Sequence, residues 1–189
     1  MTIPICESYL LFSLPDGSRH HEQVNPNDTG VDFEIASKPA VWLEVKNWEA
    51  PVIPPDKRST VDLDFANKTN TTSTFWDALV AKFEGTYDFL HARNELPQDV
   101  RLGLLLESRM FSELALAPAI SILEARIALS PKVRGRPLGV VNASRLSAMA
   151  QGTTAIACSV SPYPHCICNA PITNCSALRR IHSRKATQV

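Results

Sequence analysis

The chain has 189 residues, of which 44% are hydrophobic, and its acidic and basic groups are equal in number. This length suits one domain, and no apolar run approaches the roughly 20 residues that span a bilayer, so we expect no membrane partner. The charges are uneven, because residues 1–124 hold all 19 acidic groups while residues 125–189 hold nine basic groups and no acidic one. A basic segment of this kind is typical of a contact with nucleic acid or another acidic partner.

The N-terminal residues, MTIPICESYLLFSLPDG, contain neither a basic start nor a small-residue cleavage site. We therefore expect no secretory signal. The five cysteines are an odd number, which does not indicate a disulfide framework. Both observations predict a cytoplasmic protein with reduced thiols.

The first part of the chain predicts a short N-terminal element followed by strands. Residues 3–14 are apolar and suit a short helix or a strand, and residues 18–24 suit a strand. The stretches VDFEI at 31–35 and AVWLEVKNW at 40–48 are rich in β-branched and aromatic side chains, which predicts two strands. The prolines and polar pairs of residues 49–72 predict a long loop.

The second part of the chain predicts two helices, each followed by a strand. An apolar stripe at helical spacing predicts a helix over residues 74–94, and residues 99–108 read as a buried strand. Residues 112–129 predict a second helix, with Pro118 near its start or at a kink, and residues 137–143 predict one more strand. The order of the core is then αβββαβ, a mixed α/β pattern built on a central sheet.

The last 40 residues differ from the rest of the chain in composition. Residues 150–189 lack acidic groups and periodicity and are rich in Ser, Pro, Thr and Cys. We therefore predict a domain at residues 1–149 and a basic, poorly ordered tail at residues 150–189. A shifted reading frame would also produce so abrupt a change.

Three charged residues fall on one face of the hairpin predicted at residues 31–48. Side chains alternate between the two faces of a strand, so Glu44 and Lys46 share a face that Asp32 can join across the hairpin. The opposite face is apolar and is expected to pack on helices. Converging carboxylates need a cation, and their hard oxygen ligands suit Mg²⁺, whose shell the Val45 carbonyl could complete. A solvent-exposed sheet face is the structural alternative for the same three charges.

The sequence contains Asp32 and, after 11 intervening residues, Glu44-Val45-Lys46. This pattern resembles the motif of the PD-(D/E)xK nuclease superfamily, which includes restriction endonucleases and Holliday-junction resolvases. The resemblance covers residues 5–108 and includes the αβββαβ order. It implies a restriction-endonuclease-like fold with a central mixed sheet flanked by helices. By that resemblance, Asp32 and Glu44 would bind Mg²⁺, for which Mn²⁺ could substitute, and Lys46 would be the catalytic lysine. Val31 stands where the motif has a proline.

The resemblance implies further site residues. Many members place a glutamate on the first helix, a role that Glu7 would fill, with Glu22 as the other candidate. The helix after the motif often contributes a polar residue, and Lys82 would supply it, either beside the site or at a phosphate. Arg134 and Arg136 could contact phosphates of DNA or form an ordinary basic surface.

Two classes of function follow from these expectations. The first is a Mg²⁺-dependent endonuclease that hydrolyses DNA phosphodiester bonds. The second is a non-catalytic nuclease-fold module in a DNA repair or defence system, which the net acidic character of residues 1–124 favours, because affinity for nucleic acid draws on clustered Lys and Arg. Phosphate-binding glycine loops are absent, so ATP- or NAD-dependent chemistry is not indicated. The sequence leaves open a homodimer or a partner protein.

Overall fold

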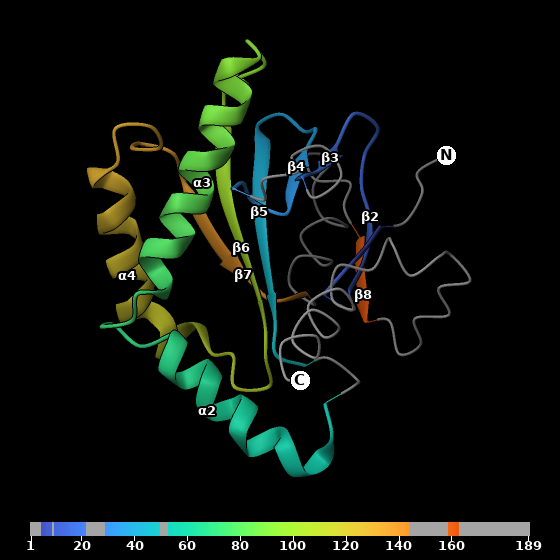
Figure 1. Ribbon diagram of the computed structural model, residues 1–189, viewed down its shortest axis with the longest axis vertical. Helices are drawn as coiled ribbons and strands as arrows, with labels where there is room; N and C mark the ends of the chain where they lie inside the picture. The colour runs from blue at the N-terminus through green and yellow to red at the C-terminus, as the bar shows by residue number, and fades with distance from the viewer. Residues whose placement is uncertain (1–4, 9, 22–28, 50–52, 144–158, 163–189) are drawn as a thin grey trace, which may run out of the picture.

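The computed structural model describes residues 5–8, 10–21, 29–49, 53–143 and 159–162 (Figure 1). These residues form an α/β structure with two sheets. The five strands of the central sheet, in spatial order, are β3 (Arg19–His20), β4 (Phe33–Ile35), β5 (Ala40–Asn47), β6 (Val100–Glu107) and β7 (Leu138–Val141). The smaller sheet contains β1 (Ile5–Glu7), β2 (Leu10–Ser13) and β8 (Ser159–Pro162). The helices are α2 (Arg58–Lys68), α3 (Phe75–Ala92) and α4 (Glu113–Leu129), with a 3₁₀ turn, η1, at Pro55–Lys57.

The central sheet is mixed, as the sequence predicts. Strands β4 and β5 form an antiparallel hairpin in which Phe33 is paired with Leu43. Strands β5, β6 and β7 are parallel, and Glu44 lies beside Leu104 in the register. The parallel pairs require crossover connections, which α3 and α4 provide.

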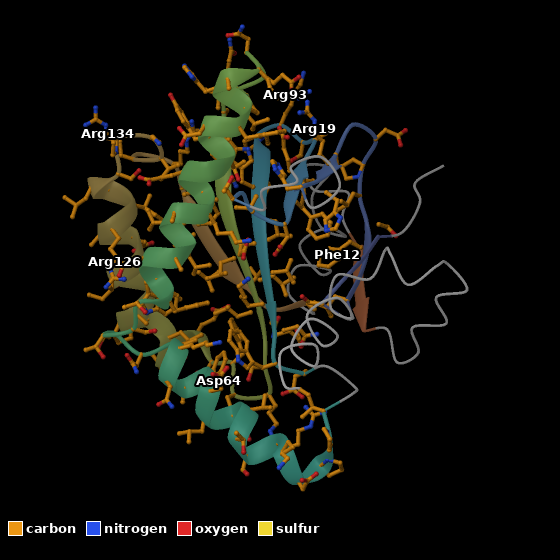
Figure 2. The ribbon with its side chains drawn as sticks, viewed as in Figure 1. Phe12, Arg19, Asp64, Arg93, Arg126 and Arg134 are labelled. Atoms are coloured by element: carbon orange, nitrogen blue, oxygen red, sulfur yellow. The ribbon has the colours of Figure 1, made fainter. Side chains whose placement is uncertain are left out.

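Helices α3 and α4 cover one face of the central sheet, and the smaller sheet lies on the other face (Figure 1). Trp42 of β5 packs beneath α3, where it shares a core with Trp76 and Phe83. On the opposite face, Leu43 packs with Phe12 of β2, whose side chain Figure 2 labels. The helices therefore cover the face that carries Trp42 and Glu44. Among the described residues, strand β2 packs on the uniformly apolar face, where the sequence predicts helices.

The N-terminal segment also departs from the predicted αβββαβ order. Strands β1 and β2 occupy residues 5–7 and 10–13, where the restriction-endonuclease-like order requires a helix. Leu10 and Phe12 are both buried and lie two residues apart in β2. Side chains with this spacing share one face of a strand, which explains why the segment is a strand rather than a helix. The α/β class is confirmed, and the finer nuclease core stays a prediction.

The predicted loop at residues 49–72 contains a helix that the sequence pattern conceals. Phe65 is the only fully buried residue of α2, so the segment shows little apolar periodicity. Its ring packs edge-on against Trp48 at 5.1 Å between centroids. Asp64 accepts a hydrogen bond from the Trp48 indole at 2.9 Å. The prolines at 54–55 precede α2, a position at which proline starts helical structure rather than breaking it.

The remaining elements agree with the sequence patterns. Helix α3, strand β6, helix α4 and strand β7 lie where periodicity predicts them, and Pro118 lies inside α4. Within residues 150–189 the structure describes only β8, which pairs with β2, and the rest of the predicted tail lies outside the described residues. In the described part of the chain, no helix combines the length and apolarity needed to cross a bilayer.

Helix α3 touches the segment before β4 at Gly85. A Cβ at position 85 would overlap the carbonyl oxygen of Thr29. At the next residue, the Thr86 hydroxyl accepts a hydrogen bond from the Val31 backbone N–H at 2.9 Å. These two contacts fix the chain immediately before Asp32, so the helix determines where that carboxylate lies.

We expect Gly85→Ala to destabilise the protein by about 2–3 kcal/mol, because the added methyl forces α3 away from Thr29. Chemical denaturation measures the change. Gly139→Ala on β7 is the matched control, since a Cβ there meets no atom within 4 Å, and its stability should change by less than about 0.5 kcal/mol. Equal stability of the two variants would contradict this packing.

Candidate active site

The Asp32 carboxylate lies beside β5, at the point where β4 leaves the sheet. The ladder between the two strands ends at Phe33, and the Val31 backbone turns to Thr86 on α3. The Asp32 Oδ2 accepts a hydrogen bond from the Val45 N–H at 2.7 Å. A buried N–H must find an acceptor, so the carboxylate takes the place of the missing strand. Asp32 is only 3% exposed.

The Val45 carbonyl faces the same edge of β5 as the Asp32 carboxylate. In an extended strand, the N–H and C=O of one residue point to the same neighbour. Since the Val45 N–H reaches Asp32, its carbonyl oxygen is directed to the gap that β4 leaves. The backbone of residue 45 therefore offers an oxygen ligand next to a carboxylate.

Glu44 is completely buried, with 0% of its surface exposed, on the face that α3 covers. Its Oε1 forms an ion pair with the Nζ of Lys46, two residues along the same strand face. The Nζ of Lys82, which comes from α3, lies 3.7 Å from the same oxygen. The Glu44 Oε2 has no hydrogen-bond partner among the described residues. One oxygen of the carboxylate is thus surrounded by two amines, while the other accepts no bond from the described chain.

This geometry differs from a solvent-exposed sheet face. The side chains of Lys46 and Lys82 are 27% and 21% exposed, so they reach from solution to a carboxylate that solvent does not touch. A carboxylate buried without compensation is unfavourable by several kcal/mol. The two lysines therefore neutralise Glu44 from the strand and from the helix.

A divalent cation fits this donor set only with water in its shell. Within the residues that the structure describes, no three His, Cys, Asp or Glu side chains are grouped closely enough to hold a metal. Two carboxylates and a backbone carbonyl nevertheless match Mg²⁺, which uses one or two carboxylates and retains several waters. The buried Oε2 of Glu44, unbonded in the described part, is the observation that favours such a ligand.

The third acidic residue expected at the site is not brought to it by the described structure. Glu7 lies on strand β1 rather than on a helix, and its side chain lies outside the described part. Glu22 lies entirely outside the described residues. The choice between them stays a prediction.

The two predicted phosphate-contacting arginines differ in their surroundings. The Arg136 guanidinium packs over the Trp42 ring at 4.9 Å and near the Tyr87 ring at 5.9 Å, closer to the start of β5. Burial lowers the pKa of Arg136 from its ordinary value. Arg134 is exposed on the connection between α4 and β7 (Figure 2). Arg136 is therefore a packing residue in this arrangement, whereas Arg134 remains open to solution.

His21 is a buried neighbour of the site that the sequence reasoning did not select. Its backbone N–H donates to the Asp32 carbonyl at 2.9 Å, and its side chain is 2% exposed. Its Nε2 lies 4.0 Å from Glu34 Oε2, and neither ring nitrogen has a hydrogen-bond partner among the described residues. Burial, with the nearby charges of Arg19, His20 and Lys82, lowers the pKa of His21 to about 4. Burial likewise raises the pKa of Glu34.

The only sequence signal for His21 is the pair of histidines at 20–21. In a short predicted strand, such a pair is equally consistent with two exposed side chains. Thr86 gives no signal either, because its role depends on the contact between α3 and Val31. The roles of both residues can be recognised only from the packing of α3 on the sheet.

The chain matches no protein-family model, no curated protein and no solved structure. Its class is therefore described by its own architecture, an α/β protein with a five-stranded mixed sheet and a buried carboxylate–lysine cluster at β5.

We expect Asp32→Ala to lower the free energy of unfolding by about 1–3 kcal/mol, because the buried Val45 N–H loses its acceptor. Asp32→Asn keeps a side-chain acceptor at the same position and should retain most of that stability. Denaturant titration of both variants measures the difference. Equal losses would show that the charge of Asp32, rather than its hydrogen bond, stabilises the fold.

His21 should make the protein less stable in acid. Its pKa is about 4 when folded and 6.5 ordinarily, so between these values the unfolded chain binds more protons and stability rises with pH. The two pKa values correspond to about 3 kcal/mol of stability that is present at pH 7 and lost by pH 4. His21→Gln removes this dependence. The measurement is the difference between the two stability curves from pH 4 to 7, and parallel curves would contradict the burial of a neutral imidazole.

Proposed function

We propose that the protein is a Mg²⁺-dependent nuclease that hydrolyses DNA phosphodiester bonds. One observation carries the proposal: Asp32, Glu44 and Lys46 surround a single stretch of β5, with Asp32 bonded to the Val45 N–H and Lys46 paired with Glu44. The choice of DNA rests on the resemblance of these residues to the PD-(D/E)xK motif.

The residues around β5 would have different roles in this reaction. Asp32, the Oε2 of Glu44 and the Val45 carbonyl would hold the cation. Mg²⁺ bound there would lower the pKa of a water molecule and stabilise the charge that develops on the phosphate. Lys46 is held beside Glu44, where its amine can donate a hydrogen bond to the attacking water or to a phosphate oxygen.

The position of the cluster under α3 supports this chemistry. Charges act more strongly on one another where the helix excludes water, and groups fixed before the reaction need no rearrangement during it. Because Glu44 is fully buried while Lys46 is partly exposed, a substrate phosphate would approach from the side of the lysine amines.

A second candidate is a non-catalytic DNA-binding or partner module on the same fold. The balanced charges favour it, since Lys46 and Lys82 already neutralise Glu44. The described part also offers no third acidic, histidine or cysteine ligand. Calorimetric titration with Mg²⁺ or Mn²⁺ separates the two candidates: heat of binding that disappears in Asp32→Asn supports the nuclease, and no heat supports the module.

Purified protein should cut DNA with Mg²⁺ or Mn²⁺ and lose this activity in EDTA. Supercoiled, linear and branched DNA should each be tested. Glu44→Gln should reduce the cleavage rate by at least about a hundredfold, because it removes a charged cation ligand. Lys46→Met should reduce the rate while leaving the heat of cation binding measurable.

Glu124→Gln, an exposed carboxylate change on α4, is the matched control and should cut like the unaltered protein. Thermal unfolding of each variant separates a lost site from a lost fold. Cleavage that persists in well-folded Glu44→Gln, or no cleavage of any DNA form with either cation, would refute the catalytic proposal.

A further inference from the structure

The outer face of helix α4 is apolar although it is exposed. The helix packs on the core through one side, which includes the buried residues Leu116, Leu123 and Ile127. The opposite side carries Leu114, which is 87% exposed, and Leu129, which is 84% exposed. In the described part of the chain these are the two most exposed large hydrophobic side chains, so the outer face of α4 is the clearest unpartnered apolar surface there.

Helix α4 also has too few charges for a helix that faces solution. Only three of its 17 residues are charged. A surface helix normally opposes its buried stripe with a charged or polar face, and a helix that is apolar all round is typical of one covered on both sides. Figure 1 shows α4 at the edge of the described structure, with α3 on one side. The outer face therefore suits an apolar partner.

The outer face has the symmetry that a second copy of the chain requires. Leu114, Pro118, Ser121, Ala125 and Leu129 are exposed and are spaced by three or four residues, which places them on one side of the helix. Leu114 and Leu129 are equally far from the middle of this stretch, and so are Pro118 and Ala125. In a two-fold dimer, residue i of one copy meets residue j of the other, and j meets i. Two antiparallel α4 helices would therefore place Leu114 against Leu129 at both ends, with small residues between them.

The charges at the two ends of α4 favour the antiparallel direction. Glu113 lies in the first turn of the helix. The exposed Arg134 stays near the other end, because its backbone N–H donates to the Ser130 carbonyl at 3.2 Å (Figure 2). An antiparallel copy brings these unlike charges together, whereas a parallel copy places like charges side by side.

The size of the face predicts a weak dimer. A helix of 17 residues is about 26 Å long and, with its side chains, about 10 Å wide. Packing two such faces buries on the order of 500 Å² per copy, and the total of about 1,000 Å² is near the lower limit for a specific interface. The affinity is therefore expected in the micromolar range.

We propose that the outer face of α4 is a homodimer interface, in which α4 packs antiparallel on α4 of a second copy. Leu114 of each copy contacts Leu129 of the other. The small residues around Ser121 lie at the two-fold axis and allow the two helices to approach closely.

Sedimentation equilibrium of the full chain, from about 1 μM to about 500 μM, tests the proposal. The unaltered chain should dimerise with a Kd between roughly 1 and 100 μM. Leu114→Glu and Leu129→Lys should each weaken the dimer at least about tenfold, because each buries a charge against a leucine. Leu114→Glu combined with Leu129→Lys should restore the dimer to within about threefold, since an antiparallel pair then joins opposite charges.

Leu63→Glu is the matched control, because Leu63 is an exposed leucine on α2, and it should leave the Kd unchanged. Thermal unfolding of each variant verifies that it is folded. Loss of the dimer in the two single variants, with recovery in the combined one, supports the proposal.

A dimer that persists in Leu114→Glu, or that Leu63→Glu weakens equally, overturns the proposed interface. Failure of the combined variant to recover overturns the antiparallel arrangement. A chain that stays monomeric at every concentration also overturns the proposal, whether its α4 face then binds phosphatidylcholine vesicles or a different protein. The experiment measures no cleavage, so its result is independent of the proposed function.

Discussion

The negative charge of Glu44 lies in the middle of the central sheet, and the arrangement around β5 depends on its neutralisation. A carboxylate without exposed surface is unfavourable unless it is paired. Lys46 can pair with it because the two residues share a strand face, and Lys82 can do so only if α3 packs close to that face. The packing of α3 on the sheet and the neutralisation of Glu44 therefore depend on each other.

The neighbouring carboxylate is stabilised by a different partner. Asp32 is held by the Val45 N–H that β4 leaves without a strand neighbour. Because one carboxylate is paired with amines and the other with the backbone, the two can lie near the same stretch of β5 in a water-poor environment. The end of β4 and the contacts of Gly85 and Thr86 with residues 29–31 set this arrangement.

The sequence predicted the elements whose apolar periodicity is strong, such as α3 and β6. It missed α2, where Phe65 alone is fully buried, because one buried side chain leaves no period to detect. Alternation correctly placed Glu44 and Lys46 on one face of the hairpin. It could not show which face the helices cover, since that depends on Trp42 meeting α3 in three dimensions. The role of Glu7 and the identity of the metal remain predictions.

The spacing of three residues on α3 restricts how this chain can diverge. Lys82, Gly85 and Thr86 occupy positions i, i+3 and i+4, which lie on one side of a helix. Inserting a single residue between them would turn Lys82 by about 100° relative to Thr86. Relatives that preserve the Asp32 and Glu44 cluster should therefore keep K-x-x-G-T without gaps. That five-residue signature, read together with D-x₁₁-E-x-K, offers a criterion for recognising distant homologues by sequence.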